Sequence, residues 1–245
     1  MNRQTGTPKK MVAQIRRALS DGGSPERASG VQWFFKEEIK SRGWRTRDVR
    51  RAIRRVRKEI LHEHDLAFLV RVADELFSGP VLEEKIAGIF LLEELDAQFG
   101  DAEFRLFEQW LDRISTWADH DGLVHYLIAP MVAAKPVRAK AVFRWAKSKD
   151  HWHRRAACVA LIRGARAKQF FPEIVRLSNL LLTDEHAMVQ KGLGWLLRET
   201  AKFDAQRNVP YLMKIRDRAP RLVLRTACET LSPAVKTQVL RRTTK

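Results

Sequence analysis

Apolar residues recur every three or four positions along most of this chain, which is the spacing of one buried helix face. The pattern is clearest from about Arg47 to His62, where Val49, Ile53, Val56 and Ile60 would share a face. No run alternates apolar and polar residues between hairpin turns, so the sequence predicts an all-α fold. Further helices are predicted at about Lys9–Ser20, Pro25–Arg42, Asp65–Ser78, Val81–Gln98, Asp101–Ile114, Trp117–Val132, Pro136–Lys147, His151–Ala165, Pro172–Leu182, Glu185–Phe203, Val209–Arg216 and Pro220–Leu231.

The later helices form pairs, and the pairs repeat at a nearly constant spacing. An ionisable residue stands early in the second helix of each pair, and successive ones are 34 or 36 residues apart: Lys85, Asp121, Arg155, Lys191 and Arg225. This period is typical of an α-solenoid, and the missing tetratricopeptide consensus favours HEAT-like pairs. Second helices of such pairs line one wall, so a concave basic groove is expected. We expect residues 1–245 to be a single domain, with an N-terminal helix and loop in 1–24 and a basic tail in 233–245.

The charge of the chain points to a polyanion as partner. There are 46 Lys and Arg against 29 Asp and Glu, a net charge of +17, which favours nucleic acid over the competing interpretation, an anionic membrane. No apolar run is long enough to cross a bilayer, and the first ten residues lack the apolar core of a secretory signal. The acidic stretch from Glu93 to Glu103 is expected to face away from the polyanion. One helix face is strongly basic and is either an ordinary solvated face or a phosphate-binding one: Arg47, Arg50, Arg51, Arg54 and Lys58.

Cysteine and histidine spacing gives no support for a metal or cofactor. Cys158 and Cys228 lie within apolar helical patterns, as buried free thiols would in a reducing cytoplasm. The pairs His62/His64 and His151/His153 have the wrong spacing for one helical face. We therefore expect no metal and no cofactor, and a cytoplasmic protein that is nucleoid-associated when bound to DNA.

Trp117 and Asp121 are four residues apart, so on a helix they lie roughly 40° apart and face the same way. A carboxylate beside an aromatic face can stabilise a transient cation. The alternative is structural, with Trp117 in the core and Asp121 paired to a surface cation. Asp119 points to the other side of the same helix and is expected to be a surface or capping residue.

Trp195 lies on one predicted helix face with Lys191 and Arg198. Gly192 and Gly194 beside it cost about 1 kcal/mol each in a helix relative to Ala, which indicates close helix packing or close approach of a partner. In another helix, Arg154 and Arg155 point about 100° apart, so only one of them can face the groove. The repeat spacing favours Arg155 and leaves Arg154 for the rim or a structural pair.

Four segments together resemble the AlkD-type DNA alkylation repair family of HEAT-like repeat DNA glycosylases. The resemblance covers about Phe34 to Leu231, and the block around Trp195 is its most specific part. Two departures are Arg47, where the family usually has Pro, and Thr116, where some members have a second Trp. The segments are Phe35-Lys36-Glu37 through Gly43-Trp44-Arg45-Thr46, Trp117-x3-Asp121, Trp152-x-Arg154-Arg155-Ala156-Ala157 and Val189 through Glu199.

The resemblance implies excision of N3- or N7-alkylated purines, such as 3-methyladenine and 7-methylguanine, from duplex DNA by a monomer without a deep base-flipping pocket. It implies that Asp121 is the catalytic carboxylate and that Trp117 and Trp195 are aromatic contacts. Arg155 and Arg198 match basic residues of the family's cleft. The full set of residues expected to contact DNA is Arg155, Lys191, Arg198, Arg154, Arg47 and Arg51.

Two other functions fit the same pattern. A non-catalytic HEAT-repeat protein could bind damaged or distorted DNA through the basic residues without using Asp121. A HEAT scaffold for protein partners would bind them with little dependence on salt, whereas phosphate contacts make affinity fall steeply as salt rises.

Overall fold

The computed structural model describes residues 6–241, and all regular secondary structure in that range is helical, which confirms the predicted all-α class. An isolated β-bridge joins Lys40 and Val81. The chain forms two compact units, Met1–Leu123 and Val124–Lys245, and each is described by itself. The single domain and the HEAT-like solenoid with its concave groove stay predictions.

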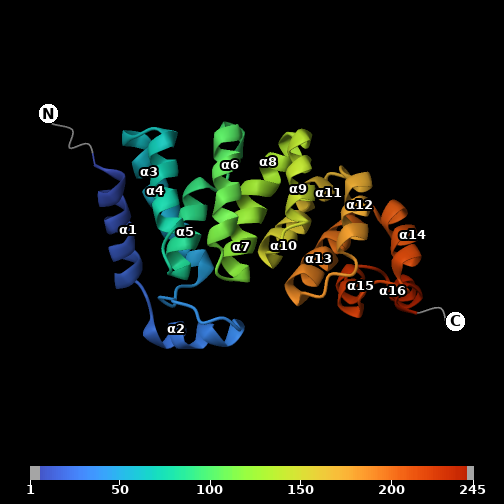
Figure 1. The fold of residues 1–245 in the computed structure, drawn as a ribbon. Coiled ribbons are helices and arrows are strands. Elements are labelled where there is room, and N and C mark those ends of the chain that lie inside the picture. The colour runs from blue at the N-terminus through green and yellow to red at the C-terminus, as the bar shows by residue number, and fades with distance from the viewer. Residues whose placement is uncertain (1–5, 242–245) are drawn as a thin grey trace. The chain divides into compact units, whose positions relative to one another are not determined.

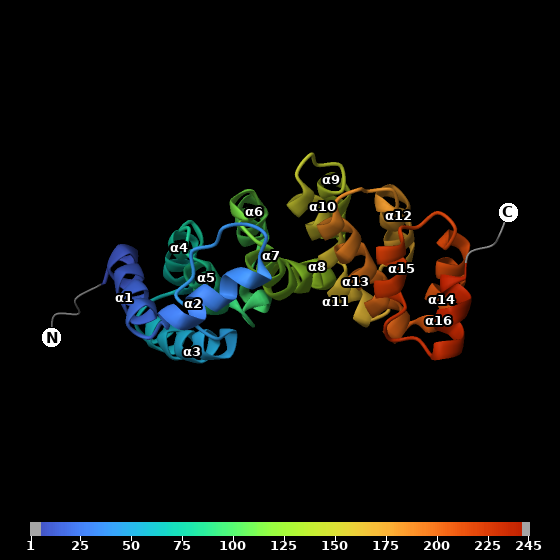
Figure 2. The same ribbon diagram turned by 90° about the horizontal axis from the view of Figure 1, so that it is seen from below.

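The helices of the first unit are α1 (Pro8–Asp21), α2 (Pro25–Val31), η1 (Gln32–Phe34), α3 (Thr46–Glu63), α4 (Leu66–Phe77), α5 (Leu82–Leu92), η2 (Asp96–Gln98), α6 (Asp101–Trp110), η3 (Leu111–Arg113) and α7 (Trp117–Leu123). Helix α5 packs against α3, α4 and α7. Gly88 allows this packing, because a Cβ there would lie 2.7 Å from the Ala73 carbonyl oxygen of α4. Figures 1 and 2 show α2 lying crosswise at one end of the other helices of this unit.

Helices α1 and α4 lie within one residue of their predicted bounds because a side chain caps each start. Thr7 accepts a hydrogen bond from the Lys10 N–H, and Asp65 accepts one from the Phe68 N–H. The predicted apolar face of α1 is buried at Val12, Ile15 and Leu19.

The predicted helix Pro25–Arg42 is wrong in its second half. Helix α2 ends at Val31 and the 3₁₀ turn η1 at Phe34. The Gln32 side chain then donates to the Glu37 carbonyl (2.8 Å) and accepts from the Ile39 N–H (3.1 Å). These bonds fold the chain back into a loop in place of a continued helix.

Helix α5 holds the end of that loop through the buried carboxylate of Glu83. It accepts hydrogen bonds from the backbone N–H groups of Arg42 (2.9 Å) and Gly43 (3.0 Å). Gly43 has a φ of +74°, which side-chain-bearing residues rarely adopt. The Arg27 guanidinium donates to the Gly43 carbonyl and ties α2 to the loop. A contact distant in sequence therefore overrides the local helical pattern.

The predicted helix Val81–Gln98 is also interrupted, because Glu94 has a φ of 68°. The turn brings Glu93 and Glu94 to helix α3, where Glu93 pairs with Arg50 (3.0 Å) and Glu94 with Arg54 (2.9 Å). Arg57 contacts both residues as well. Glu93 and Glu94 therefore neutralise part of the charge of α3, and their predicted orientation away from a polyanion stays a prediction.

The helices of the second unit are the π-helical segment η4 (Val124–Ile128), α8 (Ala129–Ala134), η5 (Pro136–Arg138), α9 (Ala139–Trp145), α10 (His151–Val159), α11 (Ile162–Arg166), α12 (Phe171–Leu181), α13 (Ala187–Phe203), α14 (Ala205–Ile215), α15 (Arg221–Ala227) and α16 (Pro233–Leu240). Helix α13 is central in this unit, because it packs against α10, α11 and α15 (Figure 2). The segment predicted as a basic tail contains α16, which packs on α14 and α15. Among residues 6–241, none of the helices combines the length and apolar character needed to span a membrane.

Candidate functional site

Helix α7 is held at its start by the buried carboxylate of Asp119. This carboxylate accepts hydrogen bonds from the backbone N–H groups of Ser115 (2.9 Å) and Thr116 (2.7 Å). The Thr116 hydroxyl also donates to Asp119 (2.6 Å) and accepts from the Ala118 N–H (3.2 Å). These bonds cap the start of the helix, because they satisfy N–H groups that have no partner within it. The predicted capping role of Asp119 is confirmed, but a surface position is wrong because the side chain is fully buried.

Lys85 of α5 pairs with that carboxylate, with its Nζ 3.4 Å from Asp119 Oδ2 and only 4% of its side chain exposed. It also donates to the Arg113 carbonyl and lies 4.9 Å from the centre of the Phe77 ring. Burial lowers the pKa of Lys85, and the nearby Asp119 carboxylate opposes this shift. Lys85 was predicted to stand on a groove wall. That prediction is wrong, because its charge is neutralised inside the first unit.

The Asp121 carboxylate is partly exposed, at 22% of its side chain, and it lies beside a buried imidazole. His120 Nδ1 is 2.7 Å from Asp121 Oδ1, and the His120 side chain has no exposed surface. Since an ionised carboxylate can only accept, Nδ1 carries the hydrogen of this bond. The buried ring thus fixes one carboxylate oxygen. Sequence reasoning missed His120, although its position next to Asp121 was a signal.

Trp117 is 39% exposed on the same face of α7 as Asp121. One face of its indole is stacked on Phe35, with 5.1 Å between the ring centres and 16° between the planes. Close packing of α7 on α5 fixes this face, because a Cβ on Gly122 would lie 3.0 Å from Ile89 Cδ1. The structure therefore brings Trp117, Asp121 and a residue not predicted, Phe35, to one place.

In the second unit, Trp195 of α13 stacks on His125, with ring centres 5.7 Å apart. Its indole Nε1 is buried and has no hydrogen-bond partner among the described residues. The glycines beside it serve close helix packing, as predicted. A Cβ on Gly194 would lie 2.7 Å from Thr226 Cβ of α15, and one on Gly192 would lie 3.1 Å from the Arg155 side chain of α10.

The two arginines of α10 are engaged inside the second unit. Arg155 is 5% exposed and donates to the Met188 carbonyl (2.7 Å). Arg154 pairs with Asp184 (2.6 Å) and donates to the Ser148 and Lys149 carbonyls. Arg154 thus has the structural pair that was one of its two predicted roles.

Helix α13 presents Lys191 and Arg198 on the side of Trp195, and the Lys191 side chain is exposed. Arg198 pairs with Glu229 (2.7 Å) and Glu199 (3.2 Å). Burial alone would lower the pKa of Arg198, but these two carboxylates raise it. The exposed Lys191 ammonium can therefore contact a phosphate directly, whereas Arg198 would first have to release a carboxylate partner.

Arg47 and Arg51 lie on the outer face of α3, in the first unit. Their side chains are 73% and 67% exposed, and both contact Asp48. One carboxylate between two guanidinium groups leaves a net positive charge that is accessible to solvent.

No three His, Cys, Asp or Glu side chains in residues 6–241 are arranged to hold a metal ion. Cys158 and Cys228 are both buried free thiols, as predicted. Burial raises the pKa of Cys158 to about 12, so it is a poor nucleophile near neutral pH.

Comparison with known proteins shows the family. Residues 15–231 match the family described as DNA alkylation repair enzyme. The chain belongs to this family. Its fold is similar to that of a solved structure titled a predicted DNA alkylation repair enzyme from Enterococcus faecalis, with a TM-score of 0.76 and 18% identity over 86% of this chain and 97% of that one. No curated protein sequence matches the chain.

Membership in the DNA alkylation repair enzyme family gives the protein a role in DNA repair and DNA as its binding partner. It confirms the family that the residues around Trp117 and Trp195 suggested. The net charge of +17 fits this partner.

Proposed function

We propose that this protein is a DNA glycosylase that hydrolyses the N-glycosidic bond of N3- or N7-alkylated purines in duplex DNA. The observation that carries the proposal is the Asp121 carboxylate, which is partly exposed, held by the buried His120 ring and on one helix face with Trp117. Family membership adds DNA and alkylation damage to this chemistry.

The reaction suits a carboxylate that works without a general acid. An N3- or N7-alkylated purine carries positive charge, so its departure as a base neutralises it. What needs stabilisation is the positive charge that develops on the deoxyribose, together with a water that attacks C1′. The His120 ring fixes the orientation of the Asp121 carboxylate, and the partly exposed carboxylate can face the sugar. The indole face of Trp117 adds cation–π attraction of about 0.5–2 kcal/mol.

The basic residues divide into direct and supporting roles. In this proposal Lys191, Arg47 and Arg51 contact phosphates, because their side chains are exposed. Trp195 contacts the DNA from α13. Arg198 contacts a phosphate by releasing its carboxylate partner Glu229. Arg154 and Arg155 have supporting roles, because they hold the loop before α13 and the start of that helix.

The decisive experiment measures release of 3-methyladenine and 7-methylguanine from methylated duplex DNA by the wild-type protein and Asp121→Asn. Loss of a preorganised electrostatic contact should slow release by about 100-fold or more while DNA affinity is retained. Asp96→Asn, which changes a partly exposed carboxylate of η2, is the matched control and should release base at the wild-type rate.

A non-catalytic DNA-binding function predicts a different pattern. The wild-type protein would then bind duplex DNA and release no alkylated base. Asp121→Ala would bind as well or better, because a carboxylate near phosphates repels them. Those two results together would show that the protein binds damaged DNA without acting as a glycosylase.

A further inference from the structure

Two adjacent aromatic side chains of the first unit are almost fully exposed to solvent. Trp33 is 89% exposed and Phe34 is 75% exposed. Exposed aromatic rings that adjoin each other are uncommon on a protein surface unless they bind something, because the rings provide a large apolar area. Trp117 and Phe203, also exposed, each reach only 39%.

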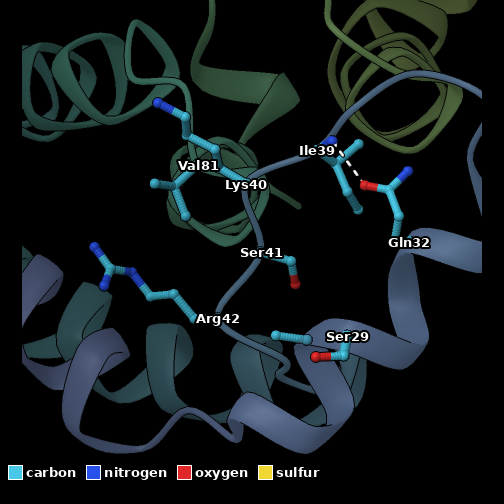
Figure 3. A pocket seen from close by; sticks show the side chains of 8 residues that line it. Ser29, Gln32, Ile39, Lys40, Ser41, Arg42 and Val81 are labelled. Atoms are coloured by element: carbon cyan, nitrogen blue, oxygen red, sulfur yellow. Dashed lines mark hydrogen bonds between the residues drawn. The ribbon is translucent and has the colours of Figure 1, made fainter.

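The segment that carries these rings is held in place. Gln32, just before Trp33, forms hydrogen bonds with the Glu37 carbonyl and the Ile39 N–H, the latter drawn in Figure 3. Helix α2 is anchored by the Ser24 N–H, which donates to the Arg42 carbonyl (2.8 Å). Beside the turn lies a pocket of about 490 Å³, whose lining includes Gln32, Ile39 and Arg42 (Figure 3). The rings are therefore displayed on a fixed element.

This aromatic turn is continuous with the candidate site. The next residue, Phe35, stacks on Trp117, which shares a helix face with Asp121. The Cα atom of Trp33 lies within about 7.6 Å of that of Phe35, since consecutive Cα atoms are 3.8 Å apart. Bases along one DNA strand rise about 3.4 Å per step. The backbone that carries the two rings is thus within one or two base steps of the residue that stacks on Trp117.

Local charge favours contact with bases over contact with phosphates. The loop after the rings carries Lys36 and Lys40 but also Glu37 and Glu38, all exposed. This balance attracts no phosphate by itself, whereas aromatic faces stack on any base. Aromatic and apolar side chains also insert between base pairs where a duplex is weakened.

We propose that Trp33 and Phe34 stack on DNA bases that lose their own stacking partners at or next to the lesion. The inference rests on the proposed function for the position of the lesion. It requires only DNA binding for the contact itself.

The test compares the full-length wild-type chain with Trp33→Ala/Phe34→Ala and with the control Phe203→Ala, an exposed aromatic of the second unit. The probes are a 20-base-pair duplex and the same duplex with one tetrahydrofuran abasic residue. The double variant should lose about fivefold or more in affinity for the abasic duplex, and less for the intact one. The control should match wild type on both.

The salt dependence of binding separates stacking from charge. The double variant should keep the wild-type slope of affinity against salt, whereas Arg47→Ala/Arg51→Ala should flatten it. Wild-type affinity of the double variant for both duplexes would overturn the inference. The inference would also be overturned if sedimentation showed that the wild-type protein is a dimer and that Trp33→Ala/Phe34→Ala is a monomer. In that case a second copy of the chain would cover the rings. If neither the wild-type protein nor any variant releases alkylated base, but the double variant still binds the abasic duplex more weakly than wild type, only the proposed function is overturned.

Discussion

Removing the Asp119 carboxylate should destabilise the protein more than the loss of any surface charge. Asp119→Ala leaves the Lys85 ammonium buried without its partner, and it frees the Ser115 and Thr116 N–H groups at the start of α7. Breaking a buried ion pair from one side costs about 3–5 kcal/mol of unfolding free energy. Glu229→Ala breaks an exposed pair with Arg198 instead and should cost less than about 1 kcal/mol.

A double-variant comparison isolates the ion pair from the helix cap. Asp119→Asn keeps an oxygen that can accept from the Thr116 N–H but removes the charge, and Lys85→Met removes the ammonium while filling similar space. Each single change should be costly. The combination Lys85→Met/Asp119→Asn should cost less than the sum of the two by about 1–3 kcal/mol, because no uncompensated charge stays buried.

Urea unfolding followed by far-ultraviolet circular dichroism measures these differences on the full chain. Because the chain has two compact units, the fit should allow two transitions, and only the one that belongs to Met1–Leu123 should move. Two results would refute a charged, coupled pair between α5 and α7. One is a double variant whose loss of unfolding free energy equals the sum of the two single losses, and the other is an Asp119→Asn variant as stable as wild type.

Two further predictions concern buried side chains. Because burial raises the folded pKa of Cys158 to about 12, from 9.0 when unfolded, the unfolded chain loses its proton first. Stability should therefore fall by about 1.4 kcal/mol per pH unit above pH 9. Cys158→Ala should show a correspondingly smaller loss between pH 8 and pH 10 in urea unfolding, and an identical loss would contradict the argument. His120→Phe removes the Nδ1 donor to Asp121 and should slow single-turnover base release by about tenfold or more at unchanged DNA affinity. His120→Asn, which retains a donor, should be slowed less, and equal rates in both variants would show that the hydrogen bond does not matter.

The fold was predictable from sequence where the signal was local. Helices α1 and α4 combine an apolar stripe with a capping residue, Thr7 and Asp65, and both were predicted within one residue. The end of α2 was not, because the loop that follows it is held by Glu83, which accepts hydrogen bonds from N–H groups about forty residues earlier in the chain. Periodicity shows which face of a segment is apolar. It carries no information about which distant carboxylate will accept hydrogen bonds from the backbone N–H groups of that segment and so prevent a helix.

The candidate site shows the same division. The spacing of Trp117 and Asp121 placed both on one face of α7, and the structure agrees. His120 and Phe35 were missed because their roles follow from burial and stacking. Lys85 was misplaced for a related reason. A regular spacing of ionisable residues does not distinguish an exposed cation from one paired inside the core.

The charge of the chain shows why composition predicted a polyanionic partner but not the residues that contact it. Every ion pair within the protein removes one cation and one anion together, so pairing cannot reduce the net charge of +17. Some arginines that looked available, such as Arg50, Arg54 and Arg154, are engaged by carboxylates. The excess must therefore be carried by other cations, and it stays accessible to a polyanion whichever residues carry it. Composition is enough to predict a polyanionic partner, and the family identifies it as DNA. The choice between Lys191 and Arg154 as a phosphate contact needs the positions of the acids.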